Sequence, residues 1–492
     1  MYYESLFVWG SLMSPAELAA SSGNSAWMLI SASLVLLMTP GLALFYGGMT
    51  ATRAALNMVM MSFGALGVVA VVYILWGWSM SYGSQSLGGL VASPFEFFGL
   101  KGALVDETGA PIAGDNGYPA VIDVGFQLTF AAISTAIISG ALAGRVKFST
   151  WLVFAGLWVS LVYFPLAHMV WGGGLLGEGD NGISAWLFGS EDGEALIAPI
   201  DFAGGAVVHI PAGVAALVLA LVVGKRRGFP ASTDRPHNLP LVMLGAALLW
   251  FGWFGFNGGS AFAADGLAGL AWLNTTVATA AAMLGWLAVE RLRDGNATSL
   301  GAASGVVAGL VTITPAAGDV GPLGAVALGA IGGALACLAV QLKFKLGYDD
   351  SLDVVGVHLV AGLWGTVGVA FVATDNGLLA GGGLDGAKLL AVQVIVAAVS
   401  LAVAGVITWL IALALKATMG WRVTDEEEFS GIDGHQHAES AYDLNPTRLG
   451  ARRGPASGGP RPKPGAAGGK PSGADKAPAA DKHAAKEKEE QR

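Results

Sequence analysis

Eleven apolar runs, each long enough to cross a lipid bilayer, constrain the fold of this chain more than any other feature of its sequence. A transmembrane helix needs about 20 predominantly apolar residues. Such runs lie at 26–49, 57–82, 123–144, 149–171, 201–223, 239–260, 268–290, 298–316, 322–342, 353–373 and 386–415. The sequence therefore predicts an all-α, polytopic membrane protein with eleven transmembrane helices and a transmembrane domain over residues 26–415.

The composition agrees with a membrane protein and excludes an ordinary soluble enzyme. Hydrophobic residues make up 54% of the 492 residues and charged ones 12%, against about 25% charged residues in soluble domains. The 73 glycines suit helices that pack closely in lipid. The single cysteine, Cys337, allows neither a disulfide framework nor a thiol metal site. We expect a protein that is not an enzyme and that needs no metal and no cofactor.

The basic residues between the runs predict the orientation of the chain. Only Lys101 and Lys388 follow an even-numbered run. Those that follow an odd-numbered run are Arg53, Arg145, Lys147, Lys225, Arg226, Arg227, Arg235, Arg291, Arg293, Lys343 and Lys345. Because Lys and Arg stay on the cytoplasmic side, the N-terminus is expected outside and the C-terminus inside. Residues 1–25 lack the basic start of a secretory signal and are expected to form a retained outer segment.

Charge is distributed unevenly along the chain. Residues 447–492 hold 11 of the 26 basic and 5 of the 35 acidic residues, which leaves 15 basic and 30 acidic residues in the first 446. So acidic a body is a poor match for nucleic acid. The longest predicted outer loops, 83–122 and 172–200, carry Glu96, Asp106, Glu107, Asp115, Glu178, Asp180, Glu191, Asp192 and Glu194. These residues either concentrate cations at an outer mouth or form an ordinary solvated surface.

Two segments follow the last run. Residues 416–446 form a charged segment that is expected on the cytoplasmic side. Residues 447–492 contain eight Gly, six Pro and a single large apolar residue, Leu449. Because such a stretch buries too little surface to offset its chain entropy, it is predicted to be a disordered tail.

Two short motifs recur with a common offset of five runs. The string from His209 to Gly213 in the fifth run resembles that from His358 to Gly362 in the tenth, and Phe45–Gly48 resembles Phe256–Gly259. Because five is odd, the second copy runs through the membrane in the opposite direction, which is the inverted-repeat plan of many transporters. The sequence thus predicts repeats at about 26–223 and 239–373, with an eleventh helix at 386–415 outside them.

The two repeated histidines are candidate functional residues. His209 and His358 lie eight and five residues after Asp201 and Asp353, well inside the predicted spans. An ionisable group there costs on the order of 3 kcal/mol or more unless it is paired or lines a path. The alternative is a neutral histidine bonded to a backbone carbonyl, which is the role expected for the unrepeated His168.

Acidic and aromatic residues near the predicted outer ends complete the candidate site. Asp201 and Asp353 begin spans, where a carboxylate caps a helix, and Asp201 is also expected to shape the outer site. Trp171 ends an outward span, and Phe256 precedes Ser260 at the end of another. An aromatic face beside a hydroxyl suits a small cation, although aromatics at such places are commonly packing or interface anchors.

Six strings resemble the ammonium transporter (Amt) family, which is related to the Rhesus proteins. They are Phe126–Phe130, Ala167–Gly174, Asp201–His209, Trp253–Ser260, Asp353–His358, and Asp425–Glu428 with Ala441–Tyr442. The resemblance covers residues 41 to about 446. One departure is the stretch 172–200, which is longer and more acidic than expected for compact bacterial members.

The resemblance implies a set of site residues and partners. The residues are Phe130, Trp171 and Ser260 as an outer ammonium recruitment site, Phe130 and Phe256 as a two-ring gate, and His209 and His358 as a twin-histidine pair in an apolar pore. It also implies a homotrimer in the cytoplasmic membrane, with one pore in each subunit. A PII-type signalling protein is expected to dock at the cytoplasmic face, although the C-terminal segment by itself shows only a charged surface.

Elementary electrostatics favours a mechanism of this type. A bare ion in an apolar pore meets a desolvation cost of tens of kcal/mol before relaxation. We therefore expect ammonium to be deprotonated and ammonia to cross, with methylammonium as a possible second substrate. An ammonium sensor that conducts little stays open as an alternative. So does a membrane electron carrier in which the two histidines ligate haem.

Overall fold

The computed structural model describes residues 15–106, 109–114, 116–231 and 235–442. Within these ranges eleven helices are long and apolar enough to cross a membrane: Ala20–Met49, Thr52–Tyr82, Ala120–Leu142, Phe148–Trp171, Gly205–Val223, Leu239–Gly259, Gly266–Asp294, Ser299–Ala316, Pro322–Leu346, Val355–Val372 and Gly383–Thr418. The predicted number is confirmed, and every predicted bound lies within six residues of the observed one. The predicted tail, 447–492, lies outside the described residues, as do residues 1–14 of the predicted outer segment.

Several spans are built from more than one helical segment. The α-helices are α2 (Pro15–Met49), α3 (Ala55–Val72), α4 (Trp78–Tyr82), α5 (Ala120–Ile138), α6 (Phe148–Trp158), α7 (Phe164–Trp171), α8 (Ile183–Phe188), α9 (Ile210–Val223), α10 (Leu239–Gly259), α11 (Gly266–Asp294), α12 (Ser299–Ile313), α13 (Pro322–Ala339), α14 (Leu342–Leu346), α15 (Ala361–Val372), α16 (Gly383–Thr418), α17 (Asp425–Ser430) and α18 (Ile432–Gln436). Short 3₁₀ turns lie at Thr52–Ala54, Phe98–Leu100, Ser139–Leu142 and Thr314–Ala316.

Four spans contain a π-helical segment, where the hydrogen-bond ladder widens by one residue. These segments are Tyr73–Gly77, Val159–Tyr163, Gly205–His209 and Val355–Val360. Such segments are rare and frequently mark functional sites. Two of them contain the repeated histidines His209 and His358.

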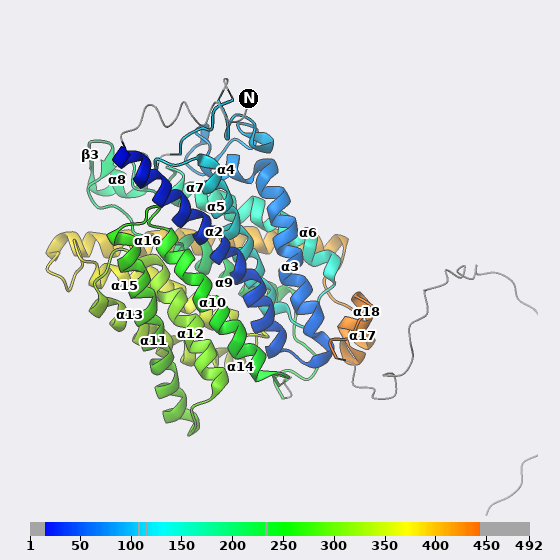
Figure 1. The fold of residues 1–492 in the computed structure, drawn as a ribbon. Coiled ribbons are helices and arrows are strands. Elements are labelled where there is room, and N and C mark those ends of the chain that lie inside the picture. The colour runs from blue at the N-terminus through cyan, green and yellow to red at the C-terminus, as the bar shows by residue number, and fades with distance from the viewer. Residues whose placement is uncertain (1–14, 107–108, 115, 232–234, 443–492) are drawn as a thin grey trace, which may run out of the picture. The chain divides into compact units, whose positions relative to one another are not determined.

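Two small β-hairpins lie at one end of the bundle. Strand β1 (Ser86–Leu87) pairs antiparallel with β2 (Val91–Ala92), and β3 (Ser190–Glu191) pairs antiparallel with β4 (Glu194–Ala195). Figure 1 shows β3 and α8 near the end at which α2 begins, and α17 and α18 near the opposite end, where α3 begins. Following the predicted orientation, we call the first the outer end and the second the inner end.

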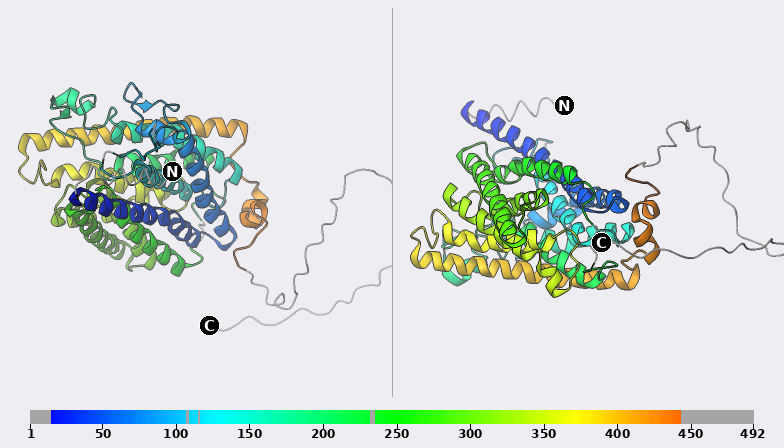
Figure 2. Two further views of the ribbon diagram at one scale, coloured as in Figure 1. Left: turned by 45° about the horizontal axis from the view of Figure 1, so that its top comes forward. Right: turned by 90° about the horizontal axis from the view of Figure 1, so that it is seen from below.

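The two repeats meet through equivalent helices. Helix α2 packs along α10, and α9 packs against the π-helical segment of the tenth span, so the first and fifth spans of one repeat pack on their counterparts in the other. Helices α5 and α9 lie in the interior and are buried along most of their length. Helix α16 crosses the bundle on one side (Figure 2) and exposes Trp409 and Leu410, a surface suited to lipid.

Candidate functional site

The two repeated histidines touch each other in the interior of the bundle. The Nδ1 atoms of His209 and His358 are 3.3 Å apart, and the two side chains are 0% and 3% exposed. In a pair of neutral imidazoles one of these nitrogens donates and the other accepts. The Nε2 atom of His209 is buried and has no hydrogen-bond partner among the described residues. The two imidazoles are therefore joined by a hydrogen bond, and Nε2 of His209 is left without a partner in a buried setting.

Glycines in the repeated motif bring the two histidines together. A Cβ atom on Gly213 would lie 2.4 Å from the backbone nitrogen of Leu359, next to His358. Reciprocally, a Cβ atom on Gly362 would lie 3.0 Å from Cβ of His209. The glycine four residues after each histidine thus lets the fifth and tenth spans approach until the imidazoles meet.

A carboxylate caps the helix of each histidine. Asp201 accepts hydrogen bonds from the backbone N–H groups of Gly205, Ala206 and Val207 at 2.5, 3.0 and 3.2 Å. In the second repeat Asp350 accepts from Val355 at 2.7 Å. Burial raises the pKa of Asp201 to about 7 against the opposing effect of the three N–H groups, and burial raises that of Asp350 to about 6.

The expectation that Asp353 caps the tenth span is wrong. Asp353 has a φ of 65°, so the chain turns there before the helix begins. Its carboxylate lies 2.6 Å from Nζ of Lys343 instead. Asp350, eight residues before His358 as Asp201 is before His209, takes the capping role.

Two phenylalanine rings lie beside His209. Phe130 on α5 and Phe256 on α10 stack with ring centroids 4.0 Å apart and an interplanar angle of 19°. The Phe256 ring lies 6.2 Å from the His209 ring, and Trp253 stacks on His209 at 5.5 Å. Both phenylalanines are buried, so these two rings and His209 form a buried stack, with His358 tilted beside His209.

A cavity of about 820 Å³ reaches the outer face of this stack. Phe130, Trp171 and Ser260 line it. The Trp171 ring lies edge-on to Phe130 at 6.2 Å, and its Nε1 donates to the carbonyl of Asp201 at 2.9 Å. The Ser260 hydroxyl donates to the carbonyl of Phe256 at 2.9 Å, which leaves its oxygen free to accept. We call this cavity the outer vestibule.

Of the four carboxylates that line the outer vestibule, Glu178 and Asp201 were expected from the sequence, and Asp123 and Asp319 were not. Of the seven predicted outer-loop acids that the structure describes, Glu178 alone lines it. The others that line it are Asp123, Asp201 and Asp319. Burial and the neighbouring Asp375 raise the pKa of Asp319 to about 6. The ends of the long 172–200 stretch line the cavity, whereas the lining includes no residue of α8, β3 or β4.

A polar stripe on α5 was also missed. Asp123, Gln127 and Phe130 line the outer vestibule together, and their spacing of four and three residues places them on one helix face. Gln127 lies inside the string Phe126–Phe130 that carries the family resemblance, and Asp123 lies three residues before that string. Asp319 lies in a turn and has no such signal.

His168 lies at the outer end in a different environment. It is 1% exposed. Its Nε2 lies 2.7 Å from the hydroxyl of Ser86, and its Nδ1 lies 3.1 Å from the carbonyl of Ser81. These contacts tie α7 to α4 and to β1, which is the arrangement of a structural histidine.

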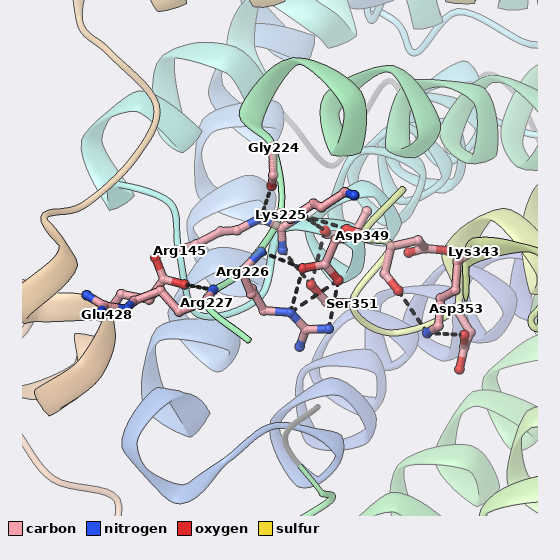
Figure 3. A network of polar contacts seen from close by, with 12 residues as sticks. Arg145, Gly224, Lys225, Arg226, Arg227, Lys343, Asp349, Ser351, Asp353 and Glu428 are labelled. Carbon is pink, nitrogen blue, oxygen red and sulfur yellow. Dashed lines mark hydrogen bonds and ion pairs between the residues drawn. The ribbon is translucent and has the colours of Figure 1, made fainter. Parts of the chain in front are cut away.

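A buried ionic network joins the two repeats at the inner end (Figure 3). Arg145 donates to the carbonyls of Gly224 and Asp349 at 3.0 and 2.7 Å, and burial lowers its pKa to about 10. The Arg226 guanidinium lies 2.8 Å from the Asp349 carboxylate. Although burial opposes ionisation, the hydrogen bonds from Arg226 and the nearby guanidinium charges hold the pKa of Asp349 below its usual value. These contacts fix the loops that follow the third, fifth and ninth spans.

The C-terminal segment, residues 424–442, packs against the same end. Glu428 accepts from the backbone N–H of Arg227 at 2.8 Å and pairs with Arg422. Asp433 accepts from Leu56 and Asn57 at 2.9 and 2.8 Å, which caps the start of α3. The segment 424–442 is thus packed on the loops between spans rather than free of them.

Comparisons with known proteins agree with this architecture. The sequence model of the family described as "Ammonium Transporter Family" matches residues 26–442. An ammonium transporter of Mycobacterium tuberculosis is 52% identical over 447 residues, covering 86% of this chain and 90% of that protein. A solved structure titled "Sensor Amt Protein" is similar with a TM-score of 0.74 and 29% identity, covering 86% of this chain and 100% of that one. Saccharomyces cerevisiae Mep2 follows with a TM-score of 0.72 and 32% identity over 85% and 90% of the two chains. This multi-pass membrane protein belongs to the ammonium transporter family.

Proposed function

We propose that this protein collects ammonium in the outer vestibule, lets it pass the rings of Phe130 and Phe256, removes its proton near His209, and conducts ammonia past the twin histidines. The observation that carries the proposal is the 3.3 Å contact between the Nδ1 atoms of His209 and His358, directly behind the Phe130–Phe256 stack. Phe130, Trp171 and Ser260 are the recruitment residues, because they offer two aromatic faces and one hydroxyl acceptor to a cation.

Deprotonation follows from the change of environment along this route. The ammonium ion resembles a lysine head group, whose pKa of about 10.4 falls by up to about 3 to 5 units on burial. That brings it close to the value of about 6.5 for imidazole. Proton transfer from ammonium to the free Nε2 of His209 is then nearly balanced, and neutral ammonia avoids the ionic desolvation cost.

The histidine contact also offers the proton a route. When Nε2 of His209 takes a proton, the Nδ1–H of His209 can pass to Nδ1 of His358, and His358 releases a proton from its own Nε2. If the proton follows this route, transport carries net charge. If it returns to the outer vestibule, the protein conducts neutral ammonia.

The test is uptake of labelled methylammonium into proteoliposomes together with current recorded on supported membranes after an ammonium jump. We expect uptake by the unaltered protein and its loss in the His209→Ala, His358→Ala double variant. His435→Ala removes an exposed histidine of α18 and is the matched control. Unchanged uptake in the double variant would remove the histidines from the proposal.

An ammonium sensor is the second candidate, favoured by the likeness to the structure titled "Sensor Amt Protein". It predicts ammonium binding without uptake in the same proteoliposomes. The haem alternative is disfavoured by geometry. Two axial histidines face an iron from opposite sides of the macrocycle, whereas these two nitrogens face each other at hydrogen-bond distance.

The proposed cellular setting is a homotrimer in the cytoplasmic membrane with the N-terminus outside. The clasped segment 424–442 supports a regulatory role for residues 416–446, with a PII-type protein docking at the inner end. Co-purification with a PII-type protein under varied ATP, ADP and 2-oxoglutarate tests the docking, and absence of a complex under all of these conditions would exclude it.

A further inference from the structure

The structure assigns to Gln127 the role of a second ammonium acceptor in the outer vestibule, beside Ser260. This inference rests on the proposed function and names a specificity-determining residue that neither the sequence motifs nor the recruitment triad identify.

Gln127 lies where a recruited cation would pass. It lines the outer vestibule together with Phe130, Trp171 and Ser260. On α5 it precedes Phe130 by three residues, so the two side chains share a helix face. The carboxamide is thus next to the first ring of the gate.

The carboxamide oxygen of Gln127 lacks a partner. The side chain is 7% exposed, and within the described part of the chain its Oε1 is buried without a hydrogen bond. A buried carbonyl oxygen without a donor is unfavourable, and such orphans in native structures point to a bound water, ion or ligand. This oxygen is therefore the acceptor that Gln127, as a residue of the vestibule lining, can offer to a cation.

Counting hydrogen-bond donors explains why ammonium needs this oxygen. The ion has four N–H groups, and each one that leaves water unpaired adds to the desolvation cost. Ser260 already donates its hydrogen to Phe256 at 2.9 Å, so its oxygen accepts one N–H. The faces of Phe130 and Trp171 accept two more by cation–π attraction. Gln127 supplies a fourth acceptor, so the number of acceptors equals the number of N–H groups on the ion.

The experiment compares Gln127→Leu and Gln127→Glu in proteoliposomes, using labelled methylammonium as the transported probe and unlabelled ammonium as the competitor. Leucine removes the acceptor, so we expect the inhibition constant for ammonium to rise about tenfold, equivalent to about 1.4 kcal/mol. The KM for methylammonium is expected to rise less, because that ion has only three N–H groups and the other three acceptors remain. The maximal uptake rate is expected to stay unchanged, because the histidine pair is intact. Glutamate keeps an acceptor oxygen, so its constants are expected to equal or fall below those of the unaltered protein.

The matched control is Thr135→Val, which removes a buried hydroxyl that bonds to Ala131 on the same helix and is expected to leave both constants unchanged. Constants that stay unchanged in Gln127→Leu would overturn the inference. So would a Gln127→Glu variant as impaired as Gln127→Leu, since that would show that the amide donates or only packs. Failure of the proposed function looks different, because the unaltered protein would then take up no methylammonium.

Discussion

The carboxylate of Asp350 does for the tenth span what the carboxylate of Asp201 does for the fifth. Each lies eight residues before one of the two repeated histidines and accepts backbone N–H groups of the π-helical segment that carries it. Because the two repeats are inverted, the two caps act on the histidine helices from opposite ends of the bundle. The position of the imidazole pair thus depends on one buried carboxylate in each repeat.

Replacing Asp350 by alanine is expected to destabilise the protein and to impair transport. Loss of a helix cap costs about 1 kcal/mol, and here the freed helix start carries His358. The thermal midpoint of the purified protein should fall, and methylammonium uptake should fall with it. Asp265 caps α11 through Leu267 and Ala268, so Asp265→Ala is a matched loss of a cap far from the histidines. Equal uptake in the two variants would separate the Asp350 cap from the pore.

Recruitment of ammonium is expected to weaken as the outer pH falls through about 7. Burial raises the pKa of Asp201 to about 7, so the carboxylate loses its charge below that pH. Ammonium keeps its proton across this range because its pKa resembles that of lysine. The KM should therefore rise between pH 8 and pH 6, and the rise should flatten in Asp201→Asn. Asp319 has a pKa raised to about 6, so it should contribute to the rise in KM only near pH 6. That part of the rise should be lost in Asp319→Asn.

The same shift in Asp201 has a stability consequence of defined sign. Its folded-state pKa is above the usual value of 3.8, so between those two values the folded protein binds more protons than the unfolded chain. The free energy of unfolding from this group therefore falls as pH rises from about 4 to about 7. The raised pKa thus opposes folding at neutral pH, as expected of a group retained for its site.

Removing one ring of the gate is expected to expose His209 to water. Phe256 is the stacking partner of Phe130 and lies between the outer vestibule and His209, so Phe256→Ala opens this barrier. We expect the His209 imidazole to react with diethyl pyrocarbonate in the variant and to be protected in the unaltered protein, as read by mass spectrometry. His168 is buried by other contacts and serves as the internal control. Equal labelling of His209 in both proteins would contradict a closed ring pair.

The number and bounds of the spans could be predicted from the sequence because the bilayer sets the length and the composition of each span. Span length, the alternation of basic residues and the five-run offset each follow from a constraint visible in one dimension, and the eleven spans were predicted to within six residues. The contact between His209 and His358 was predicted only through repeat symmetry and family likeness, since their facing depends on Gly213 and Gly362.

What the sequence did not predict depends on backbone geometry and on contacts between helices. The spacing of eight residues that Asp350 shares with Asp201 was visible in the sequence, but the φ of 65° at Asp353 and its ion pair with Lys343 were not. Gln127 is one of several polar residues in a largely apolar helix, a pattern that fits a packed or a functional residue. That its Oε1 lacks a hydrogen-bond partner, and that it lines the outer vestibule, can be seen only in the folded structure.

The C-terminal segment 424–442 contains a glycine, Gly431, that lies against Arg53. Gly431 has a φ of 126°, and a Cβ atom there would lie 2.9 Å from Cβ of Arg53. Gly431→Ala therefore strains the backbone and collides with the loop before α3, at a cost of more than about 1 kcal/mol. Because Asp433 caps Leu56 and Asn57, undocking should increase hydrogen exchange both in residues 424–442 and at those two amides.

A second glycine supplies the control for this change. A Cβ atom on Gly434 would meet nothing within 4 Å, so Gly434→Ala makes the same chemical change in the next helix without a collision. Its exchange should match that of the unaltered protein. Equal protection in both variants would show that the contacts of Glu428 and Asp433 hold the segment without the close approach at Gly431. Increased exchange in Gly431→Ala alone would tie docking of the segment to the loops that Arg145 and Arg226 fix at the inner end.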